Sequence, residues 1–226
     1  MEKIAVIVAG GSGLRMGKDT PKQFLLLQNK PILAHTIGAF TEAFSEIQII
    51  LVLPEAHIER GKEIIKEFKN TSIKIVEGGD SRFQSVKNGI KAIKAKESVV
   101  FVHDGVRCLL TPFLIRQCYE QAIKLGSAIP AVAATDSIRL TTDNGLSVVT
   151  ERNNVRIVQT PQTFLSSILM PAFEQKYQES FTDEATVVEA FGNTVHLIEG
   201  DYTNLKITRP IDLLIAEKIL EERCSK

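Results

Sequence analysis

The sequence predicts an α/β domain built on a mainly parallel sheet that helices cover on both faces. Runs rich in Ile and Val alternate along the chain with amphipathic stretches of helical length, and these runs are continuously apolar, as in strands buried on both sides. The strand runs are IAVIVA (4–9), IQIILVL (47–53), IKIVEG (73–78), VVFVHD (99–104) and SAIPAVAA (127–134). We therefore expect a Rossmann-like architecture.

Helical stretches and one further strand complete the expected fold. Helices are predicted for PILAHTIGAFTEA (31–43), SRFQSVKNGIKAIK (81–94), FLSSILMPAFEQKY (164–177) and TDEATVVEAF (182–191). The segment TVHLIEG (194–200) predicts a strand, and an amphipathic helix should run from Pro210 to about Arg223.

The segment from Ser137 to Gln159 has a different pattern. In SIRLTTDNGLSVVTERNNVRIVQ, apolar and polar residues alternate around a DNG turn, which is a strong hairpin signal, and no helix is expected. No linker, internal repeat or low-complexity tract separates this segment from the rest of the chain. We therefore expect residues 1–226 to form one domain in which residues 137–159 are an inserted β-arm.

The composition is that of an ordinary globular protein. Apolar residues make up 44% and charged residues 24% of the 226 residues, and 27 Lys and Arg balance 27 Asp and Glu. A nucleic-acid partner usually requires a basic surface, so none is expected. The N-terminal MEKIAVIVAGG contains an apolar run that is too short for a signal sequence or a membrane span, so no membrane association is expected either.

The three cysteines are Cys108, Cys118 and Cys224, and they form no C-x-x-C pair. An odd, scattered set indicates neither a disulfide framework nor a zinc site. We therefore expect the protein in the reducing cytoplasm.

The first strand ends in a glycine-rich loop within VIVAGGSGLRMGKDTPKQF (6–24). Ligands of open parallel sheets bind at the carboxyl ends of the strands, and glycines let backbone N–H groups approach an anion closely. The loop lacks the GK[ST] ending of a P-loop, and its glycines do not form the dinucleotide pattern G-x-G-x-x-G. It carries Arg15 and Lys22 instead, seven residues apart, which can wrap a triphosphate from two sides. From the glycines alone, a turn with two solvated cations is an equally good interpretation.

Several motifs resemble those of one enzyme family. AGGSGLRMGKDTPKQF is similar to the signature G-x-G-x-R-M-x(n)-P-K of sugar-nucleotide pyrophosphorylases and cytidylyltransferases. It is followed by GGDSRFQSVKNG, VHDGVR, TDSI, ERNNV, QTPQTF, TDEAT and TNLKITRPIDL. In this order and over nearly the whole chain, the motifs resemble the 2-C-methyl-D-erythritol 4-phosphate cytidylyltransferase family of the nucleotidyltransferase superfamily. Each motif alone is weak, whereas the ordered set is specific.

The resemblance implies an activity and a set of site residues. The family joins CTP to a sugar-alcohol phosphate on the non-mevalonate route to isoprenoids and releases pyrophosphate, with magnesium on the triphosphate. Arg15 and Lys22 would grip the triphosphate, and Lys206 would hold the reacting phosphate group. Arg152 would bind the methylerythritol phosphate of the partner subunit in a homodimer formed through the arm. The remaining binding residues implied are Ala9, Gly10, Gly11, Gly13, Gly79, Asp80, Ser85, Asp104, Gly105, Arg107, Ser137 and Thr182.

Elementary chemistry favours the same kind of site. A phosphate monoester oxygen is already anionic at neutral pH, so it needs no general base, and the difficulty is to bring anions together in line. Such a site should be rich in fixed cations. The sequence has Arg and Lys in its loops, and it contains neither H-E-x-x-H nor G-x-S-x-G.

Four of the residues also have simpler interpretations. Asp104 could be a magnesium ligand at a strand end, although the triphosphate can supply most ligands itself. His103, a lone histidine beside an apolar run, is interpreted as structural. Without the resemblance, Arg152 would be taken for a solvated hairpin residue. Plain helix capping by Thr182 or Asp183 is the alternative to a substrate contact by Thr182.

Two rival functions share these motifs. Ribitol 5-phosphate cytidylyltransferase is a relative with the same loops and a longer polyol substrate. A non-catalytic module that senses CTP is the rival from another class. The retained Arg15, Lys22, Arg152 and Lys206 argue against a sensor, because a protein that only binds CTP has no need of the pair on the substrate side.

Overall fold

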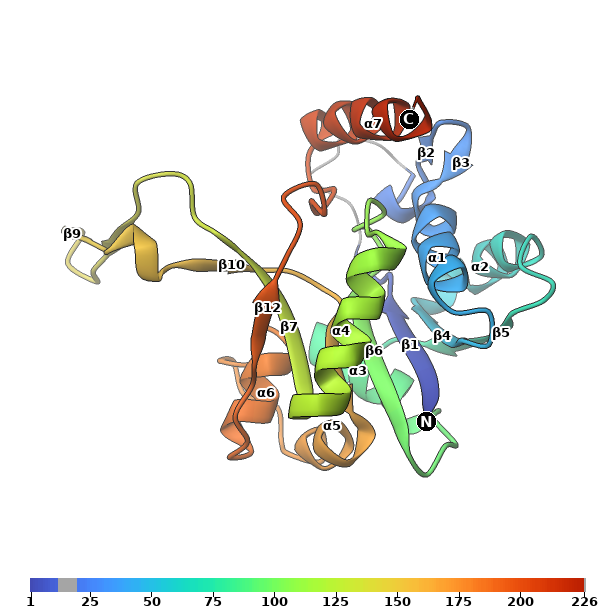
Figure 1. Ribbon diagram of the computed structural model, residues 1–226, viewed down its shortest axis with the longest axis horizontal. Coiled ribbons are helices and arrows are strands. Elements are labelled where there is room, and N and C mark those ends of the chain that lie inside the picture. The colour runs from blue at the N-terminus through green and yellow to red at the C-terminus, as the bar shows by residue number, and fades with distance from the viewer. Residues whose placement is uncertain (12–19, 226) are drawn as a thin grey trace.

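A twisted sheet runs through the centre of the protein (Figure 1). The computed structural model describes residues 1–11 and 20–225, and in that part of the chain the sheet has eight strands. Their order is β10, β7, β11, β6, β1, β4 and β5. Strand β12 lies outside this order and pairs with β7. The strands are β1 (Glu2–Val8), β4 (Gln48–Leu53), β5 (Ser72–Glu77), β6 (Ser98–Asp104), β7 (Ser127–Ala133), β10 (Arg156–Val158), β11 (Gln162–Leu165) and β12 (Leu197–Glu199).

The sheet is mainly parallel, so the predicted fold class is confirmed. Strand β1 pairs in parallel with β4 and β6, and β4 pairs in parallel with β5. Strand β11 is antiparallel and lies between β6 and β7. Strand β11 differs from the prediction of one helix over residues 164–177. The helix begins only at Ser166, since Phe164 is fully buried as a strand residue between its neighbours.

Helices cover both faces of the sheet. On one face, α1 (Ile32–Ala43), α2 (Ile58–Ile65) and α4 (Pro112–Leu125) enclose one apolar cluster. On the other face, α3 (Arg82–Lys91), α5 (Ser166–Ala172) and α6 (Glu184–Ala190) enclose a second. The last helix, α7 (Pro210–Cys224), covers one end of the sheet with a third, smaller cluster. This cluster includes Leu27 of the short strand β2 (Leu26–Leu27), which pairs with β3 (Lys30–Pro31).

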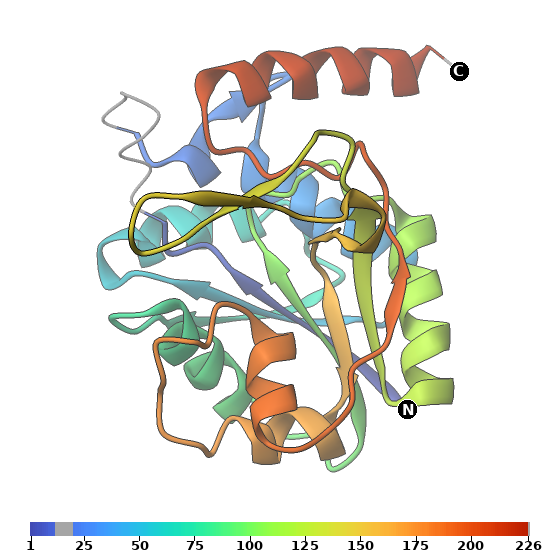
Figure 2. The same cartoon turned by 90° about the vertical axis from the view of Figure 1, so that its left-hand side faces the viewer.

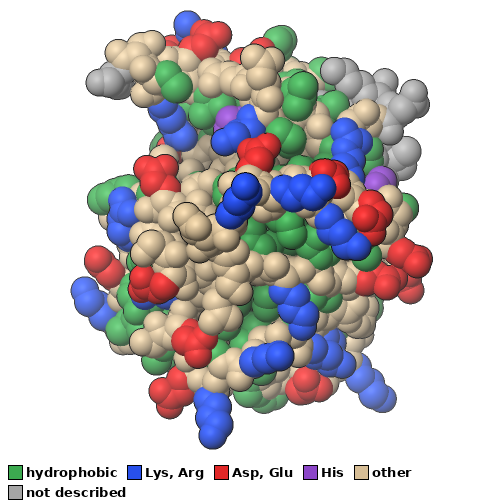
Figure 3. Space-filling model, turned by 90° about the vertical axis from the view of Figure 1, so that its right-hand side faces the viewer, with side chains coloured by type: hydrophobic (Ala, Val, Ile, Leu, Met, Phe, Trp, Pro, Cys, Tyr) green, Lys and Arg blue, Asp and Glu red, His purple; other side chains and the backbone are tan. Residues whose placement is uncertain are grey.

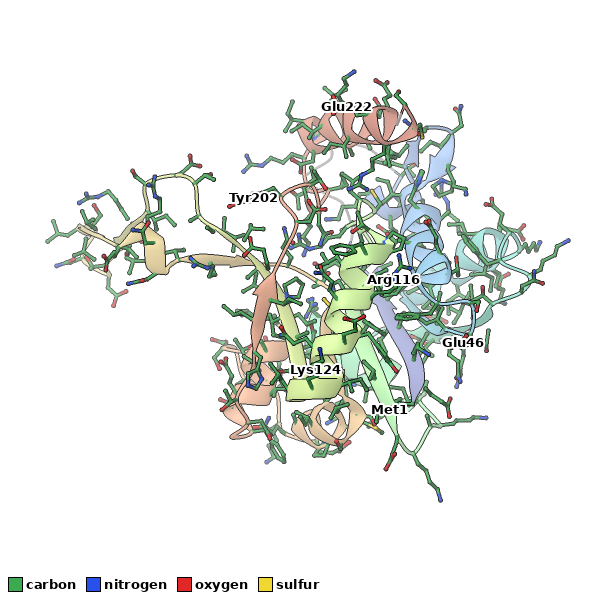
Figure 4. All side chains as sticks on the ribbon, in the orientation of Figure 1. Met1, Glu46, Arg116, Lys124, Tyr202 and Glu222 are labelled. Carbon is green, nitrogen blue, oxygen red and sulfur yellow. The ribbon has the colours of Figure 1, made fainter. Side chains whose placement is uncertain are left out.

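The hairpin that the alternation predicts is present and projects from the body (Figure 1). Figure 2, viewed from the side of the arm, shows the hairpin in front of the sheet. Strands β8 (Arg139–Thr141) and β9 (Ser147–Val149) pair only with each other among the described residues. Gly145 in the connecting turn has a φ of 79°, which a glycine adopts without strain. The chain then makes a single 3-10 turn at Arg152–Asn154, where no helix was expected, and returns to the sheet as β10. The hydroxyl of Tyr202 donates to the Ala133 carbonyl at 3.2 Å near the base of the arm (Figure 4).

The surface carries charges of both signs, as the balanced composition predicts. Lys and Arg lie interspersed with Asp and Glu on the side opposite the arm (Figure 3).

Cys108 and Cys118 are buried free thiols whose burial raises the pKa of each to about 12, while Cys224 is exposed. A search of the described residues finds no helix long and apolar enough to cross a membrane.

Candidate active site

A cavity of about 520 Å³ opens where β1, β4, β5 and β6 end. A nucleotide-sized ligand fits this volume, and the carboxyl ends of parallel strands are where such sheets bind ligands. The residues that line the cavity are Val8, Ala9, Gly10, Gly11, Lys22, Gln23, Val52, Leu53, Pro54, Glu55, Glu77, Gly78, Gly79, Asp80, Ser81, Arg82, Ser85, Asp104, Val106 and Lys206.

The first wall is the start of the glycine loop. Ala9 continues the sheet, since its N–H donates to the Val52 carbonyl at 2.9 Å. The amide of buried Gln23 then donates to the Ala9 carbonyl at 2.8 Å and ties the two ends of the loop together. A Cβ placed on Gly11 would lie 3.4 Å from Lys22 Cε, so the Lys22 side chain runs along the glycine backbone. Glycine backbone and a lysine side chain therefore line the same cavity.

The second wall is the loop before α3. Gly79 N–H donates to Ser85 Oγ at 3.0 Å, and the Ser85 hydroxyl lies 2.9 Å from the Ser81 carbonyl. Ser81 caps α3 by accepting from Gln84 N–H at 3.0 Å. Ser85 thus lines the cavity while its hydroxyl holds the loop that carries Gly79 and Asp80.

The end of β6 supplies the floor. Gly105 N–H donates to the Val8 carbonyl at 2.9 Å, and a Cβ on Gly105 would lie 2.9 Å from Ala9 Cβ. Only a glycine permits this close approach of the two strand ends without displacing one of them. Asp104, the residue before it, consequently faces the cavity with its side chain only 10% exposed.

Three cations surround the Asp104 carboxylate. Lys206 Nζ lies 3.0 Å from Oδ2, Arg107 Nε lies 3.5 Å from Oδ2, and Arg82 Nη2 lies 3.4 Å from Oδ1. Burial by itself would raise the pKa of Asp104, but Arg82 and the other two cations outweigh burial and hold the pKa well below its usual range. Asp104 is therefore ionised throughout the neutral range.

Local anchors place Lys206 over this carboxylate. Asn204 is fully buried and donates to the Thr160 carbonyl at 2.9 Å, while Ile207 N–H donates to the Val106 carbonyl at 3.0 Å. Lys206 lies between these two fixed points, and its side chain is 41% exposed toward the cavity. The backbone thus fixes the base of this side chain.

Arg82 has a second carboxylate partner behind the wall. Its Nη1 contacts Glu184 Oε1, and its Nη2 donates to Glu184 Oε2 at 3.1 Å. Burial raises the pKa of Glu184 and the facing Arg82 opposes that rise, while Glu184 and Asp104 overcome the effect of burial on Arg82 and raise its pKa. A forked contact of this kind is the strongest form of arginine–carboxylate pair.

His103 lies next to Asp104 but faces the core. It is fully buried, its Nδ1 lies 2.9 Å from Thr160 Oγ1, and its Nε2 lies 3.2 Å from the Arg107 carbonyl. Burial lowers its pKa to about 3, so the ring is neutral. With Nε2 as the donor and Nδ1 as the acceptor, both ring nitrogens are satisfied, which agrees with the structural interpretation.

The remaining predicted residues lie elsewhere. Arg152 and Ser137 line a separate hollow of about 300 Å³ on the arm, where Arg152 donates to the Thr135 carbonyl at 3.0 Å. Thr182 is exposed and does not line the first cavity, and Asp183 rather than Thr182 caps α6. Arg107 supports Asp104 without lining the cavity. Arg15 and Gly13 fall outside the described residues.

The surroundings of Asp104 disfavour it as a magnesium ligand. Three cations already lie within 3.5 Å of its two oxygens, and Mg²⁺ would have to compete with them for a largely buried carboxylate. Within residues 1–11 and 20–225, no three His, Cys, Asp or Glu side chains group so as to hold a metal ion.

No role is predicted from the sequence for Arg82, Glu184 or Gln23. Arg82 and Glu184 each stand inside a quoted motif, GGDSRFQSV and TDEAT, and each begins a helix. The only signal was that two charged residues stand at the start of helices with apolar faces. Nothing in the spacing of 102 residues between them indicates that they pair.

Comparisons with known proteins agree with this geometry. A family model described as IspD, 2-C-methyl-D-erythritol 4-phosphate cytidylyltransferase, matches residues 3–222. The chain belongs to this family. Curated cytidylyltransferases of this name resemble it closely. That of Bacteroides thetaiotaomicron is 44% identical over 221 residues, covering 97% of this chain and 100% of the relative. That of Bacteroides fragilis is 42% identical over 222 residues, with 97% and 100% covered.

A solved structure supports the same cytidylyltransferase family. The 4-diphosphocytidyl-2C-methyl-D-erythritol synthase of Anaerococcus prevotii superposes with a TM-score of 0.84 at 26% identity. The match covers 97% of this chain and 98% of that protein. The fold and the family motifs therefore extend over the same length of chain.

Proposed function

We propose that this enzyme transfers CMP from CTP to 2-C-methyl-D-erythritol 4-phosphate, giving 4-diphosphocytidyl-2-C-methyl-D-erythritol. A phosphate oxygen of the acceptor forms a bond to the α-phosphorus of CTP. The bond from that phosphorus to the bridging oxygen breaks, and pyrophosphate leaves with the electron pair. The observation that carries the proposal is the cavity at the strand ends, which combines a glycine backbone with Lys22 and Lys206 in a chain of this family.

The cavity suits a reaction between anions. Lys22 runs along the glycine loop and would bind the triphosphate, together with Arg15 from the same loop. Lys206, in the segment before α7, lines the same cavity and would bind the acceptor phosphate. The two lysines would bring the reacting groups together and offset the charge that builds at the α-phosphorus. A general base is not required, which fits the burial of His103 and the engagement of both its ring nitrogens by Thr160 and Arg107.

Magnesium enters as part of the nucleotide substrate, MgCTP. The ion would neutralise charge on the triphosphate, and oxygens of the triphosphate, rather than protein side chains, would supply most of its ligands. Asp104 would keep its three cations in place.

The acceptor side of the site would be completed by a second copy of the chain. Arg152 and Ser137 lie together on an arm that projects from the body, and neither lines the cavity of its own chain. The arm also exposes apolar side chains, among them Val149 at 75% and Leu146 at 66%, which a partner surface would cover. We propose a homodimer in which Arg152 binds the acceptor phosphate in the partner's cavity. From the unpaired cysteines we place the enzyme in the cytoplasm.

Pyrophosphate release by the purified protein tests the proposal. The protein is incubated with magnesium, CTP and either methylerythritol 4-phosphate, ribitol 5-phosphate or no acceptor. Release that depends on methylerythritol 4-phosphate is the expected result. A preference for ribitol 5-phosphate would retain the chemistry and change the substrate. Saturable CTP binding without release would indicate the sensor and refute the proposal.

A further inference from the structure

Glu184 is a buried carboxylate that does not reach the cavity. Its side chain is 1% exposed, it is the first residue of α6, and it is absent from the cavity lining. Both of its oxygens contact the guanidinium of Arg82, which does line the cavity. Arg82 is therefore the side chain that links Glu184 directly to the cavity.

Arg82 lies within reach of two carboxylates and is closer to Glu184. The Glu184 contact is forked, with Nη2 at 3.1 Å from Oε2, whereas the same Nη2 lies 3.4 Å from Asp104 Oδ1. Asp104 is left with its other oxygen 3.0 Å from Lys206 Nζ. The order of these distances assigns Arg82 mainly to Glu184 and Asp104 mainly to Lys206.

We propose that Glu184 is a positioning residue for Lys206: by holding Arg82 in a fork, it prevents Arg82 from forming that fork with Asp104 and so keeps Asp104 bound to Lys206. The inference rests on the proposed function, in which Lys206 binds the acceptor phosphate.

Competition between Arg82 and Lys206 is the physical reason. A guanidinium matches a carboxylate with two parallel N–H donors, whereas an ammonium meets it as a point charge, so Arg82 without Glu184 would displace Lys206 from Asp104. Lys206 would then leave the position at which Asp104 holds it. A small displacement of a group that orients a reactant lowers the rate strongly.

Glu184→Gln tests this with little change of shape. The Gln side chain keeps an acceptor oxygen but loses the charge that holds Arg82. We expect kcat/KM for methylerythritol 4-phosphate to fall about 10- to 100-fold. The Kd of MgCTP, measured without acceptor, should stay within about twofold, because the glycine loop and Lys22 are untouched.

Gln162→Met is the matched control. Gln162 anchors the same helix start, donating to Asp183 Oδ2 at 2.8 Å and accepting from Ala185 N–H at 2.8 Å. Neither hydrogen bond involves Arg82, Glu184, Asp104 or Lys206. The Gln162→Met variant should have a destabilised α6 and a kcat/KM for methylerythritol 4-phosphate near the wild-type value. An equal loss of kcat/KM in both variants would overturn the proposal, since the integrity of α6 would then explain the effect.

Removing both charges should restore activity. In Arg82→Met/Glu184→Met there is no guanidinium to capture Asp104, and buried ion pairs often tolerate apolar replacement of both partners. We expect its kcat/KM to exceed that of Glu184→Gln. A double variant no better than the single one would overturn the proposal. Glu184→Asp, which keeps the charge and shortens the reach, should give a smaller loss in the same direction and serves if Glu184→Gln does not fold.

Lysine labelling gives a readout that does not depend on activity. Acetylation of Lys206 by N-hydroxysuccinimidyl acetate is followed by peptide mass spectrometry and divided by that of Lys218, an exposed lysine of α7 that pairs with Glu221. The ratio should rise several-fold in Glu184→Gln and stay constant in Gln162→Met. An unchanged ratio in Glu184→Gln would overturn the proposal even if the wild-type protein released no pyrophosphate, whereas a rise without any pyrophosphate release would refute only the proposed function.

Discussion

Buried His103 should make the protein lose stability as the pH falls below neutrality. Burial lowers the pKa of the His103 ring from 6.5 to about 3 in the folded protein. The negative charge of Asp104 opposes this shift of the pKa, and the positive charges of Arg107 and Arg82 add to it. Between these two values the unfolded chain binds a proton that the folded protein does not. Stability therefore falls as the pH is lowered through this window.

The size of the effect follows from the two pKa values. Lowering the pH from about 7 to about 5 should cost about 2 kcal/mol of unfolding free energy from this ring alone. In a chain of 226 residues that corresponds to a fall in Tm of about 4–8 °C. Burial raises the pKa of Glu184, so its contribution has the opposite sign, and a difference between two variants is needed to remove it.

The comparison is between wild type and His103→Gln. A Gln side chain can accept from Thr160 and donate to the Arg107 carbonyl as the ring does, but it does not titrate. Urea unfolding followed by circular dichroism at several pH values gives the free energy of each protein. The wild type should lose about 2 kcal/mol more than the variant over the interval from about pH 7 to about pH 5. Parallel pH dependences in the two proteins would refute the assignment of a neutral ring.

Three further substitutions test other parts of the structure. Lys22→Ala should lower kcat about 100-fold or more and leave the fold intact by circular dichroism, because the side chain acts on the triphosphate; near-normal turnover would remove Lys22 from the mechanism. Arg152→Ala should mainly raise KM for the sugar-alcohol phosphate in steady-state assays, and an effect confined to CTP would contradict the assignment. Gly89→Ala should destabilise by about 1–3 kcal/mol in urea unfolding, because its Cβ would lie 2.6 Å from Val6 Cγ1 and 2.9 Å from Val52 Cγ2; unchanged stability would show that α3 can shift.

The sheet and most helices could be predicted because each rests on a local pattern. The five apolar runs are the strands β1, β4, β5, β6 and β7, and the DNG turn closes a hairpin. Strand β11 could not be predicted in the same way. Its four residues precede Ser166 without a turn signal, and what makes them a strand is pairing with both β6 and β7. This pairing depends on tertiary contacts, which leave no periodic pattern in the sequence.

From the residues alone, the site was predictable only where a loop carries its own signature. The glycine loop brought Ala9, Gly10, Gly11 and Lys22 to the cavity, and these can be inferred from a strand that ends in glycines followed by a cation. Five further cavity-lining residues were assigned through the family resemblance: Gly79, Asp80, Ser85, Asp104 and Lys206. Arg82 and Glu184 could not be paired from the sequence, because they meet across two helix starts that only the sheet places together. Thr182 was assigned through the family, and the structure leaves it exposed beside the helix cap.

The charges around Asp104 explain why a reaction between two anions can use a site with a carboxylate in its floor. An isolated carboxylate there would repel both phosphate groups. Lys206, Arg107 and Arg82 oppose that charge, and Glu184 in turn balances Arg82, so three cations stand against two carboxylates and the wall keeps one positive charge. Because the compensating groups belong to α3, α6, the turn after β6 and the loop before α7, the charge balance holds only when these elements are packed together. Folding of the domain is therefore what makes this wall attractive to a phosphate.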